Sequence, residues 1–329
     1  ITALFALAAC SAVAGTQAPA ASSDAAAGTL FVANKRGASV SRIDLATGEE
    51  TQRVDTCENP HELSISPDGE RLIVACYSGR SAEIYSIADL SPVEVLDLGE
   101  GARAHVALWL ADDRVLAGAE GRGSIVQLLD VGGRLTGTFE HEVGEVGPHL
   151  LAVDVAANRA WGTIIPTGEV VLWDITPGAI GELARARIGN AIEAIALAPG
   201  ASSLWVSSNE DNVAYRLDPV TLEVQAEVPT GEVPIRLATH PSGDFVVSSN
   251  FGSGDLTVID TATNEALRTI PVSGSSDAVQ VTLVFSEDGE RLYAAETATD
   301  TIAEIDFASG EVLRRLPTGP GGDGLAIID

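Results

Sequence analysis

Short, mostly apolar runs recur along the chain at a nearly constant spacing, and polar, turn-forming segments separate them. The seven runs read LFVAN, LIVAC, VLAGA, AWGTI, LWVSS, FVVSS and LYAAE, and they begin at Leu30, Leu72, Val115, Ala160, Leu204, Phe245 and Leu292. Their mean spacing is about 44 residues, a repeat length typical of β-propellers. We therefore expect an all-β fold, a seven-bladed β-propeller.

Each repeat holds four strand-like runs, which predicts four-stranded antiparallel blades. In the second repeat these runs are HELSIS, LIVAC, AEIYSI and PVEVLDL, and the turn SPDGER joins the first two. The third run ends in Asp in six repeats, and each Asp precedes a turn. An Asx-type turn explains these residues without a functional role. They are Asp44, Asp130, Asp174, Asp218, Asp260 and Asp306.

The last run, GDGLAIID at 322–329, matches the first strand of a repeat, such as HELSIS, whereas no such strand precedes Thr29. We therefore expect the C-terminal run to be the innermost strand of the first blade. This arrangement closes the ring and removes an exposed sheet edge. The propeller then spans residues 29–329.

The beginning of the chain has a different composition. Residues 1–9, ITALFALAA, read as the apolar part of a signal peptide. The segment LAAC resembles the bacterial lipobox, in which the cysteine is lipidated, and Ser11 after Cys10 fits an outer-membrane destination. Residues 10–28 then comprise Cys10 and a flexible Ala/Ser-rich tether. A plain secretory signal with a chance cysteine is the alternative. We expect a lipid-anchored protein of the periplasm or cell surface, in the outer membrane of a bacterium.

The formal net charge is −28. An acidic surface repels nucleic-acid phosphates and anionic lipid headgroups, and it favours cations and basic partners. No apolar run approaches the roughly 20 residues of a transmembrane helix. We therefore expect no nucleic-acid partner, membrane contact only through the lipid anchor, and a monomer.

The repeat pattern, LFVAN…SRIDLATGEE…PHELSISPDGERL, resembles the YVTN family of seven-bladed β-propellers over about residues 29–329. The resemblance implies the same fold. The family includes surface-layer, periplasmic and binding proteins, and related propellers include lactonases and subunits of periplasmic redox enzymes. Fold does not choose among these functions, so function has to be argued from the site.

Aligning the repeats on their turns places one residue of each at the start of an innermost strand. This row holds His61, His105, His149, Glu193, Ile235, Val281 and Asp323, and Arg236 and Gln280 reach the same place if a register shifts by one. Because innermost strands line the channel, we expect the row to converge at its mouth within roughly 10 Å. The candidate ligand-binding residues are His61, His105, His149, Glu193, Arg236 and Asp323.

Three interpretations of this row remain open. In the first, repetition of an ancestral Pro-His pair leaves a polar funnel that binds a protein partner or small ligand. In the second, His61, His105 and His149 hold zinc, copper or iron, together with Glu193 or Asp323.

In the third, His149, Glu193 and Arg236 act on a lactone or ester, with Arg236 stabilising the oxyanion. No specific catalytic motif accompanies these residues. A binding scaffold is therefore the main prediction, and an enzyme is not favoured.

Cys57 and Cys76 lie at one end of the second blade. Counting back through the SPDGER turn places residue 61 opposite residue 76, so Cys76 is expected beside His61. In an oxidising compartment we expect a Cys57–Cys76 disulfide. Two free thiols, or a soft-metal site with His61, are the alternatives. The sequence contains no CxxCH for covalent haem, no GxSxG and no Gly-rich phosphate loop.

Overall fold

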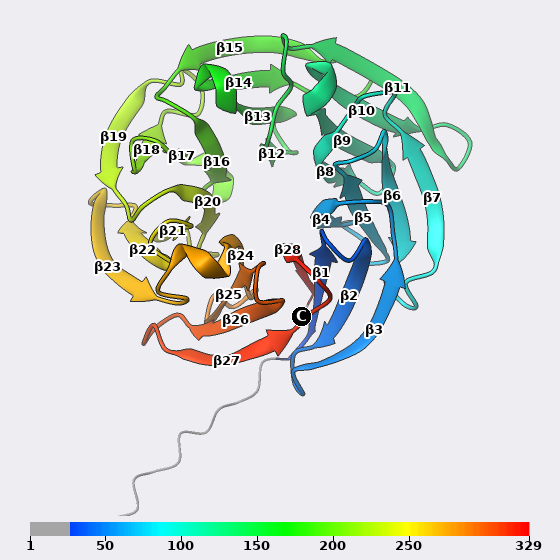
Figure 1. Cartoon of the computed structure of the whole chain (residues 1–329). Helices are drawn as coiled ribbons and strands as arrows, with labels where there is room; N and C mark the ends of the chain where they lie inside the picture. Colours follow the sequence, from blue (N-terminus) through cyan, green and yellow to red (C-terminus); the bar gives the residue numbers. More distant parts are fainter. Residues whose placement is uncertain (1–26, 329) are drawn as a thin grey trace, which may run out of the picture.

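The computed structural model describes residues 27–328, which form seven four-stranded antiparallel sheets arranged in a ring around a central channel (Figure 1). The predicted seven-bladed propeller is confirmed. Within these residues, no helix has the length and apolar character needed to cross a bilayer. The expected signal segment, lipidation at Cys10 and most of the tether lie outside the described residues.

The inner two strands of each blade line or approach the channel. The innermost strands are β28 (Gly322–Ile328), β4 (Pro60–Ile65), β8 (Ala104–Ala111), β12 (Leu151–Asp154), β16 (Ile192–Leu197), β20 (Pro234–Thr239) and β24 (Gln280–Phe285). The second strands are β1 (Thr29–Asn34), β5 (Arg71–Cys76), β9 (Arg114–Ala119), β13 (Arg159–Ile164), β17 (Leu204–Ser208), β21 (Phe245–Asn250) and β25 (Arg291–Glu296).

The outer two strands complete each blade. The third strands are β2 (Ser39–Asp44), β6 (Ser81–Ser86), β10 (Ser124–Asp130), β14 (Glu169–Asp174), β18 (Val213–Leu217), β22 (Asp255–Asp260) and β26 (Thr301–Asp306). The outermost strands are β3 (Glu49–Asp55), β7 (Pro92–Asp97), β11 (Leu135–Glu142), β15 (Gly181–Arg187), β19 (Val224–Pro229), β23 (Glu265–Pro271) and β27 (Val312–Pro317). The described part of the chain also contains four short 3-10 turns, which are η1 (Glu120–Arg122), η2 (Ile165–Thr167), η3 (Pro199–Ala201) and η4 (Ser276–Ala278).

The apolar repeat runs are the second strands. In β5, for example, every residue after Arg71 is buried, because both faces of the blade pack against neighbouring blades. The outermost strand β3 instead alternates between exposed and half-buried residues. The pattern of apolar and polar residues therefore indicates whether a strand is in the interior of its blade or at its outer edge.

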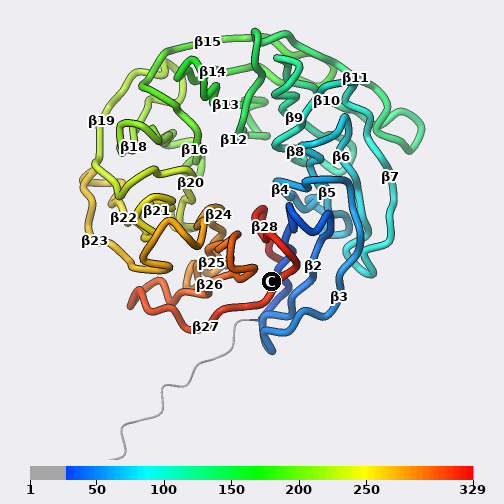
Figure 2. Tube along the Cα trace, viewed as in Figure 1, coloured from blue at the N-terminus to red at the C-terminus, as the bar shows by residue number. Residues whose placement is uncertain are grey.

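The ring is closed by the two ends of the described chain. Strand β28 pairs with β1 in antiparallel register, with Thr29 opposite Ile328 and Val32 opposite Leu325. Figure 2 shows the C-terminal strand, in red, beside the first blue strands. The predicted closure by the last run is confirmed.

The repeated Asp residues form the expected turns. The carboxylate of Asp44 accepts a hydrogen bond from the Thr47 backbone N–H at 2.8 Å, and Asp306 accepts one from Ser309 at 2.8 Å. These six Asp residues therefore belong to the scaffold.

An extra residue interrupts six of the seven innermost strands of the described chain at the same level, near the strand start. In β4, Leu63 pairs with Val74 but Pro60 pairs with Cys76, so two residues face one on the partner strand. Equivalent shifts occur in β8, β16, β20, β24 and β28. The expected pairing of His61 with Cys76 is therefore wrong by one residue, because uniform counting from the turn cannot anticipate a β-bulge.

Candidate functional site

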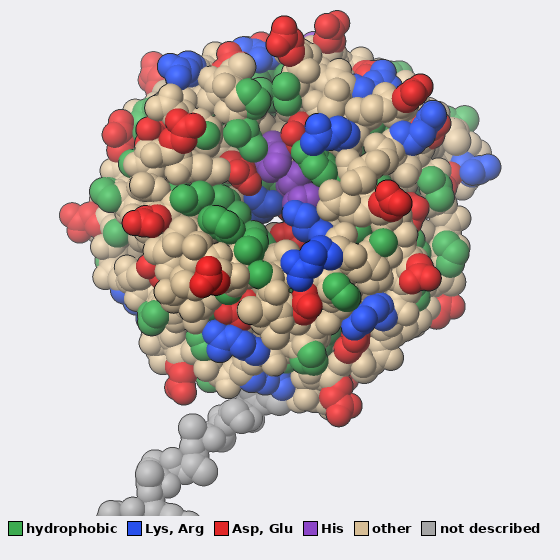
Figure 3. Space-filling model, in the orientation of Figure 1, with side chains coloured by type: hydrophobic (Ala, Val, Ile, Leu, Met, Phe, Trp, Pro, Cys, Tyr) green, Lys and Arg blue, Asp and Glu red, His purple; other side chains and the backbone are tan. Residues whose placement is uncertain are grey.

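The predicted row lies at one mouth of the channel, around a pocket of about 220 Å³. Its lining consists of Lys35, His61, Tyr77, His105, His149, Glu193, Ile235, Arg236, Val281 and Asp323. Figure 3 shows histidine side chains, in purple, in the central opening with charged side chains beside them. Gln280 does not join them: its amide donates to Ser249 Oγ and to the Asp255 carbonyl inside the blade.

The β-bulges explain why polar side chains of the row reach the axis. A bulge leaves one residue unpaired, bends the strand and re-aims the side chains beside it. In β4 the bulged residues are His61 and Glu62, in β8 the extra residue is His105, and in β16 Glu193 lies in the bulge. The β-bulges that shift the strand register therefore also place these side chains in the site.

The three imidazoles form a stack. The ring centroids of His61 and His105 are 3.7 Å apart with a tilt of 40°, and those of His105 and His149 are 3.7 Å apart with a tilt of 39°. Tyr77 meets the first two rings edge-on, with centroids 5.4 Å from each. His105, the middle ring, is only 1% exposed.

One end of the stack is held by acidic groups from blades one and two. His61 Nδ1 lies 3.0 Å from Asp323 Oδ2 and 3.8 Å from Glu62 Oε1. Lys35 Nζ is 3.3 Å from the same Asp323 oxygen. Burial disfavours the ionised form of Asp323, but His61 and Lys35 outweigh burial and lower its pKa.

The other end of the stack is held by two further carboxylates. His149 Nδ1 lies 2.9 Å from Glu120 Oε2, and its Nε2 lies 3.5 Å from Glu193 Oε1. Burial alone would lower the pKa of His149, but the bonds to Glu120 and Glu193 outweigh it and raise the pKa. The geometry therefore favours an imidazolium at this position.

The middle ring has a different environment. Nδ1 of His105 is buried and has no hydrogen-bond partner among the described residues. Burial, together with the neighbouring cationic groups, holds the pKa of His105 well below its usual value. His105 is therefore neutral at neutral pH.

Arg236 crosses the channel. Its NH1 lies 3.0 Å from Glu193 Oε1 in the neighbouring blade, and its NH2 lies 3.1 Å from Glu62 Oε1 on β4. Burial opposes its charge, but the two carboxylates outweigh burial and raise the pKa of Arg236. Burial likewise opposes ionisation of Glu193, yet the hydrogen bond with His149 and the charge of Arg236 lower its pKa to about 2.

Sequence reasoning missed a second row that contacts the first. These residues directly follow the second strand of a blade, five positions after the start of the apolar run, and they are Lys35, Tyr77, Glu120 and Asn209. Each contacts a residue of the first row. Asn209 Nδ2 donates a hydrogen bond to Glu193 Oε2 at 2.5 Å. Lys35 contacts Asp323, and Glu120 contacts His149. The same repeat alignment, read one strand further out, would have identified them.

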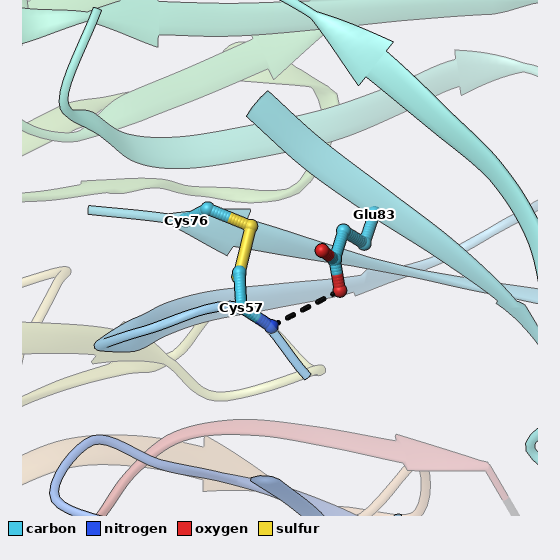
Figure 4. Close-up of side chains that lie close together, drawn as sticks. All are labelled: Cys57, Cys76 and Glu83. Atoms are coloured by element: carbon cyan, nitrogen blue, oxygen red, sulfur yellow. Dashed lines mark hydrogen bonds between the residues drawn. A yellow bond between two sulfur atoms is a disulfide. The ribbon is translucent and has the colours of Figure 1, made fainter. Parts of the chain in front are cut away.

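The disulfide between Cys57 and Cys76 is present, with Cα atoms 5.8 Å apart, which confirms that prediction (Figure 4). Glu83 lies beside it and accepts a hydrogen bond from the Cys57 backbone N–H at 3.1 Å. Sulfurs joined in this way are not available as thiolate ligands, so the soft-metal alternative with His61 does not apply to the oxidised form. The disulfide fixes the segment that leads into His61.

Comparison with known proteins supports the fold. A family model described as YNCE-like beta-propeller matches residues 1–119. No curated protein matches the sequence.

Several solved structures are similar in fold. Kuenenia stuttgartiensis hydrazine synthase aligns with a TM-score of 0.71 and 16% identity over 85% of this chain and 93% of that one. A functionally unknown protein from Desulfotomaculum acetoxidans aligns with a TM-score of 0.75 and 11% identity over 92% of this chain and 99% of that one.

Dihydro-heme d1 dehydrogenase NirN, in complex with DHE, aligns with a TM-score of 0.63 and 16% identity over 91% of this chain and 75% of that one. At such identities the similarity concerns the fold alone. The chain is thus a seven-bladed β-propeller whose first 119 residues match the YNCE-like model.

Proposed function

We propose that this chain is an extracytoplasmic binding propeller that holds a small cationic ligand at the histidine-lined mouth of its channel. The observation that carries the proposal is the burial of three stacked imidazoles and their charged partners around a pocket. Burying such groups is costly, and a propeller does not need them to close its ring. Ligand binding at this site would explain why these costly buried groups are present.

The size and charge of the pocket define the class of ligand. A volume of about 220 Å³ lies below the range of about 300–1,000 Å³ usual for drug-sized ligands. The occupant is therefore an ion or a molecule of few non-hydrogen atoms. Four carboxylates at the mouth outnumber the three cationic groups, which are Lys35, Arg236 and the His149 imidazolium, and this balance favours a cation. The carboxylates are those of Glu62, Glu120, Glu193 and Asp323.

The geometry does not favour the hydrolase interpretation. Both oxygens of Glu193 are engaged, by Asn209 on one side and by Arg236 and His149 on the other. With a pKa of about 2, Glu193 is a weak base. Arg236 is already bridged between two carboxylates, so it is poorly placed to stabilise an oxyanion.

Imidazole NMR tests the proposal. Protein with ¹⁵N-labelled histidine is titrated separately with Zn²⁺, methylammonium and acetate, and long-range ¹H–¹⁵N spectra are recorded. We expect the signals of His61, His105 and His149 to shift with at least one cation and not with acetate, while those of His141 and His240 stay unchanged. Absence of a shift at the mouth with every probe would overturn the proposal.

For localisation, we propose lipid anchoring through Cys10, which is supported by the lipobox-like sequence and by a disulfide suited to an oxidising compartment. Metabolic labelling with a palmitate analogue in a Gram-negative host tests it. Label and membrane association should be lost in Cys10→Ser and kept in the double variant Cys57→Ser/Cys76→Ser. Equal labelling of Cys10→Ser and the parent protein would contradict the anchor.

A further inference from the structure

We infer that His61, Glu62 and His105 form a site for one divalent first-row transition-metal cation at the channel mouth. This inference rests on the proposed function, since it names the ligand of the same pocket. One ring nitrogen from each histidine and one carboxylate oxygen of Glu62 lie within 4.8 Å of one another. Donors of a tetrahedral site with bonds of about 2.1 Å are about 3.4 Å apart, so small side-chain rotations bring them onto one ion.

The buried nitrogen of His105 is an independent sign of a missing partner. Nδ1 of this ring finds no hydrogen bond among residues 27–328, although the residue is only 1% exposed. A buried polar atom without a hydrogen-bond partner destabilises the folded state. Because His105 is held between two other rings, it cannot readily turn toward water, and a bound cation would provide the partner.

A carboxylate outside the proposed ligand set holds His61 in position. Asp323 Oδ2 lies 3.0 Å from His61 Nδ1. Metal-bound histidines commonly contact a carboxylate that fixes the orientation of the ring and adds negative charge. Glu62 contacts Arg236 through Oε1, at 3.1 Å, which leaves its other oxygen to face a cation.

The donor atoms indicate which kind of metal the site would bind. They also differ from the three histidines that the sequence predicted as ligands. Two imidazoles and one carboxylate suit Zn²⁺, Cu²⁺ or Fe²⁺, whereas Mg²⁺ and Ca²⁺ prefer oxygen donors alone. His149 is not included, because both of its nitrogens face carboxylates, those of Glu120 and Glu193. Glu62, adjacent to His61 in the β4 bulge, takes its place.

Calorimetry on the full chain without a histidine tag, stripped with chelator and dialysed, tests the assignment. We expect one Zn²⁺ per chain and no comparable binding of Mg²⁺. His105→Ala and Glu62→Gln should each weaken Zn²⁺ binding by at least about 100-fold, and Asp323→Asn by about 10- to 100-fold. His141→Gln and His240→Gln are matched controls away from the mouth and should leave the affinity unchanged. Circular dichroism verifies that each variant is folded, and Glu62→Gln preserves side-chain size.

The outcomes separate this assignment from the proposed function. Zn²⁺ binding that is unaffected by His105→Ala and Glu62→Gln would overturn the assignment of ligands. A parent protein that binds no Zn²⁺, but whose imidazole signals shift with methylammonium, would overturn the metal site and leave the binding function standing. Absence of a shift with every probe would overturn both.

Discussion

The two ends of the channel are built from the same seven innermost strands, yet they differ in chemistry. At the mouth, where these strands begin, charged and imidazole side chains enclose a pocket of about 220 Å³. Near the opposite end, a larger pocket of about 580 Å³ is mostly apolar; its lining consists of Leu237, Ala238, Thr239, Pro241, Leu283, Val284, Phe285, Ser286, Glu287, Ile327 and Ile328. The smaller pocket carries the chemistry, so volume alone does not identify a site.

The difference follows from strand regularity. Toward the far end most of the ladders run without interruption into the turns, with Ile65 opposite Leu72 and Phe285 opposite Leu292. Strand β8 is an exception, because a second register shift lies between Trp109 and Ala111. At the mouth the extra residues break the alternation and turn polar side chains to the axis. The regular end of the blade therefore serves the scaffold, and the irregular end is where candidate function lies.

Removal of strand β28 should have the largest effect, because this strand contributes Asp323 to the mouth and Ile327 to the far pocket. Deletion of residues 322–329 exposes the edge of β1 and opens the ring, and it should cost more than about 5 kcal/mol, a large part of the stability of a typical domain. Deletion of residues 1–26 should cost far less. Urea unfolding followed by circular dichroism measures both, and equal losses would contradict the role of β28.

Arg236→Met tests the mouth alone. It leaves the buried carboxylates of Glu62 and Glu193 without their shared cation, which should cost about 3–5 kcal/mol of unfolding free energy. Leu237→Met, at the next residue, lines the far pocket and should cost less than about 1.5 kcal/mol. Urea unfolding compares the two variants; an Arg236→Met loss no larger than that of Leu237→Met would remove the distinction between the ends.

The buried carboxylate of Glu193 at the mouth should make the stability of the protein depend on pH. The folded pKa of Glu193 is about 2, against 4.5 as the ordinary value. A lowered pKa contributes stability that is fully present above the unfolded value and is lost as pH falls toward the folded value, here about 3 kcal/mol. Glu193→Gln should therefore be less stable than the parent by about that amount above pH 5, and the difference should shrink toward pH 2.

Urea unfolding at several pH values measures this difference. Glu227→Gln on the exposed outer strand β19 is the control and should change stability by less than about 0.5 kcal/mol throughout. A Glu193→Gln deficit that does not depend on pH would show that packing, not charge, sets its effect.

The disulfide provides a further test, confined to one blade. Replacing both cysteines in Cys57→Ser/Cys76→Ser removes a loop closure with a sequence separation of 19 and should cost about 3 kcal/mol. Because the loop contains His61, its imidazole signals should shift or broaden, whereas those of His240 should not. Unfolding curves with and without reductant measure the stability. An unchanged His61 spectrum would show that the disulfide does not position the mouth residues.

Much of the scaffold could be read from the sequence, since blade number, ring closure and the disulfide follow from repeat spacing and residue type. The candidate row was also visible, because the alignment identified the strand starts. Bulges were not visible, because an extra residue in a strand leaves no signal in the spacing of the repeats. Glu62 and the shared role of Arg236 were therefore missed. Glu120 was missed for another reason, because it lies in η1, directly after β9, and the alignment was read only at the innermost strands.

Closure of the ring by β28 also sets an order in time. Strands β1 and β28 pair across about 300 residues of chain, as with Thr29 and Ile328. During synthesis β1 emerges long before its partner, and its inner edge stays unpaired until the last strand arrives. Asp323 reaches His61 only at that moment. A ligand that binds at the mouth would therefore bind only chains whose ring has closed, and its binding would stabilise the closed ring against reopening.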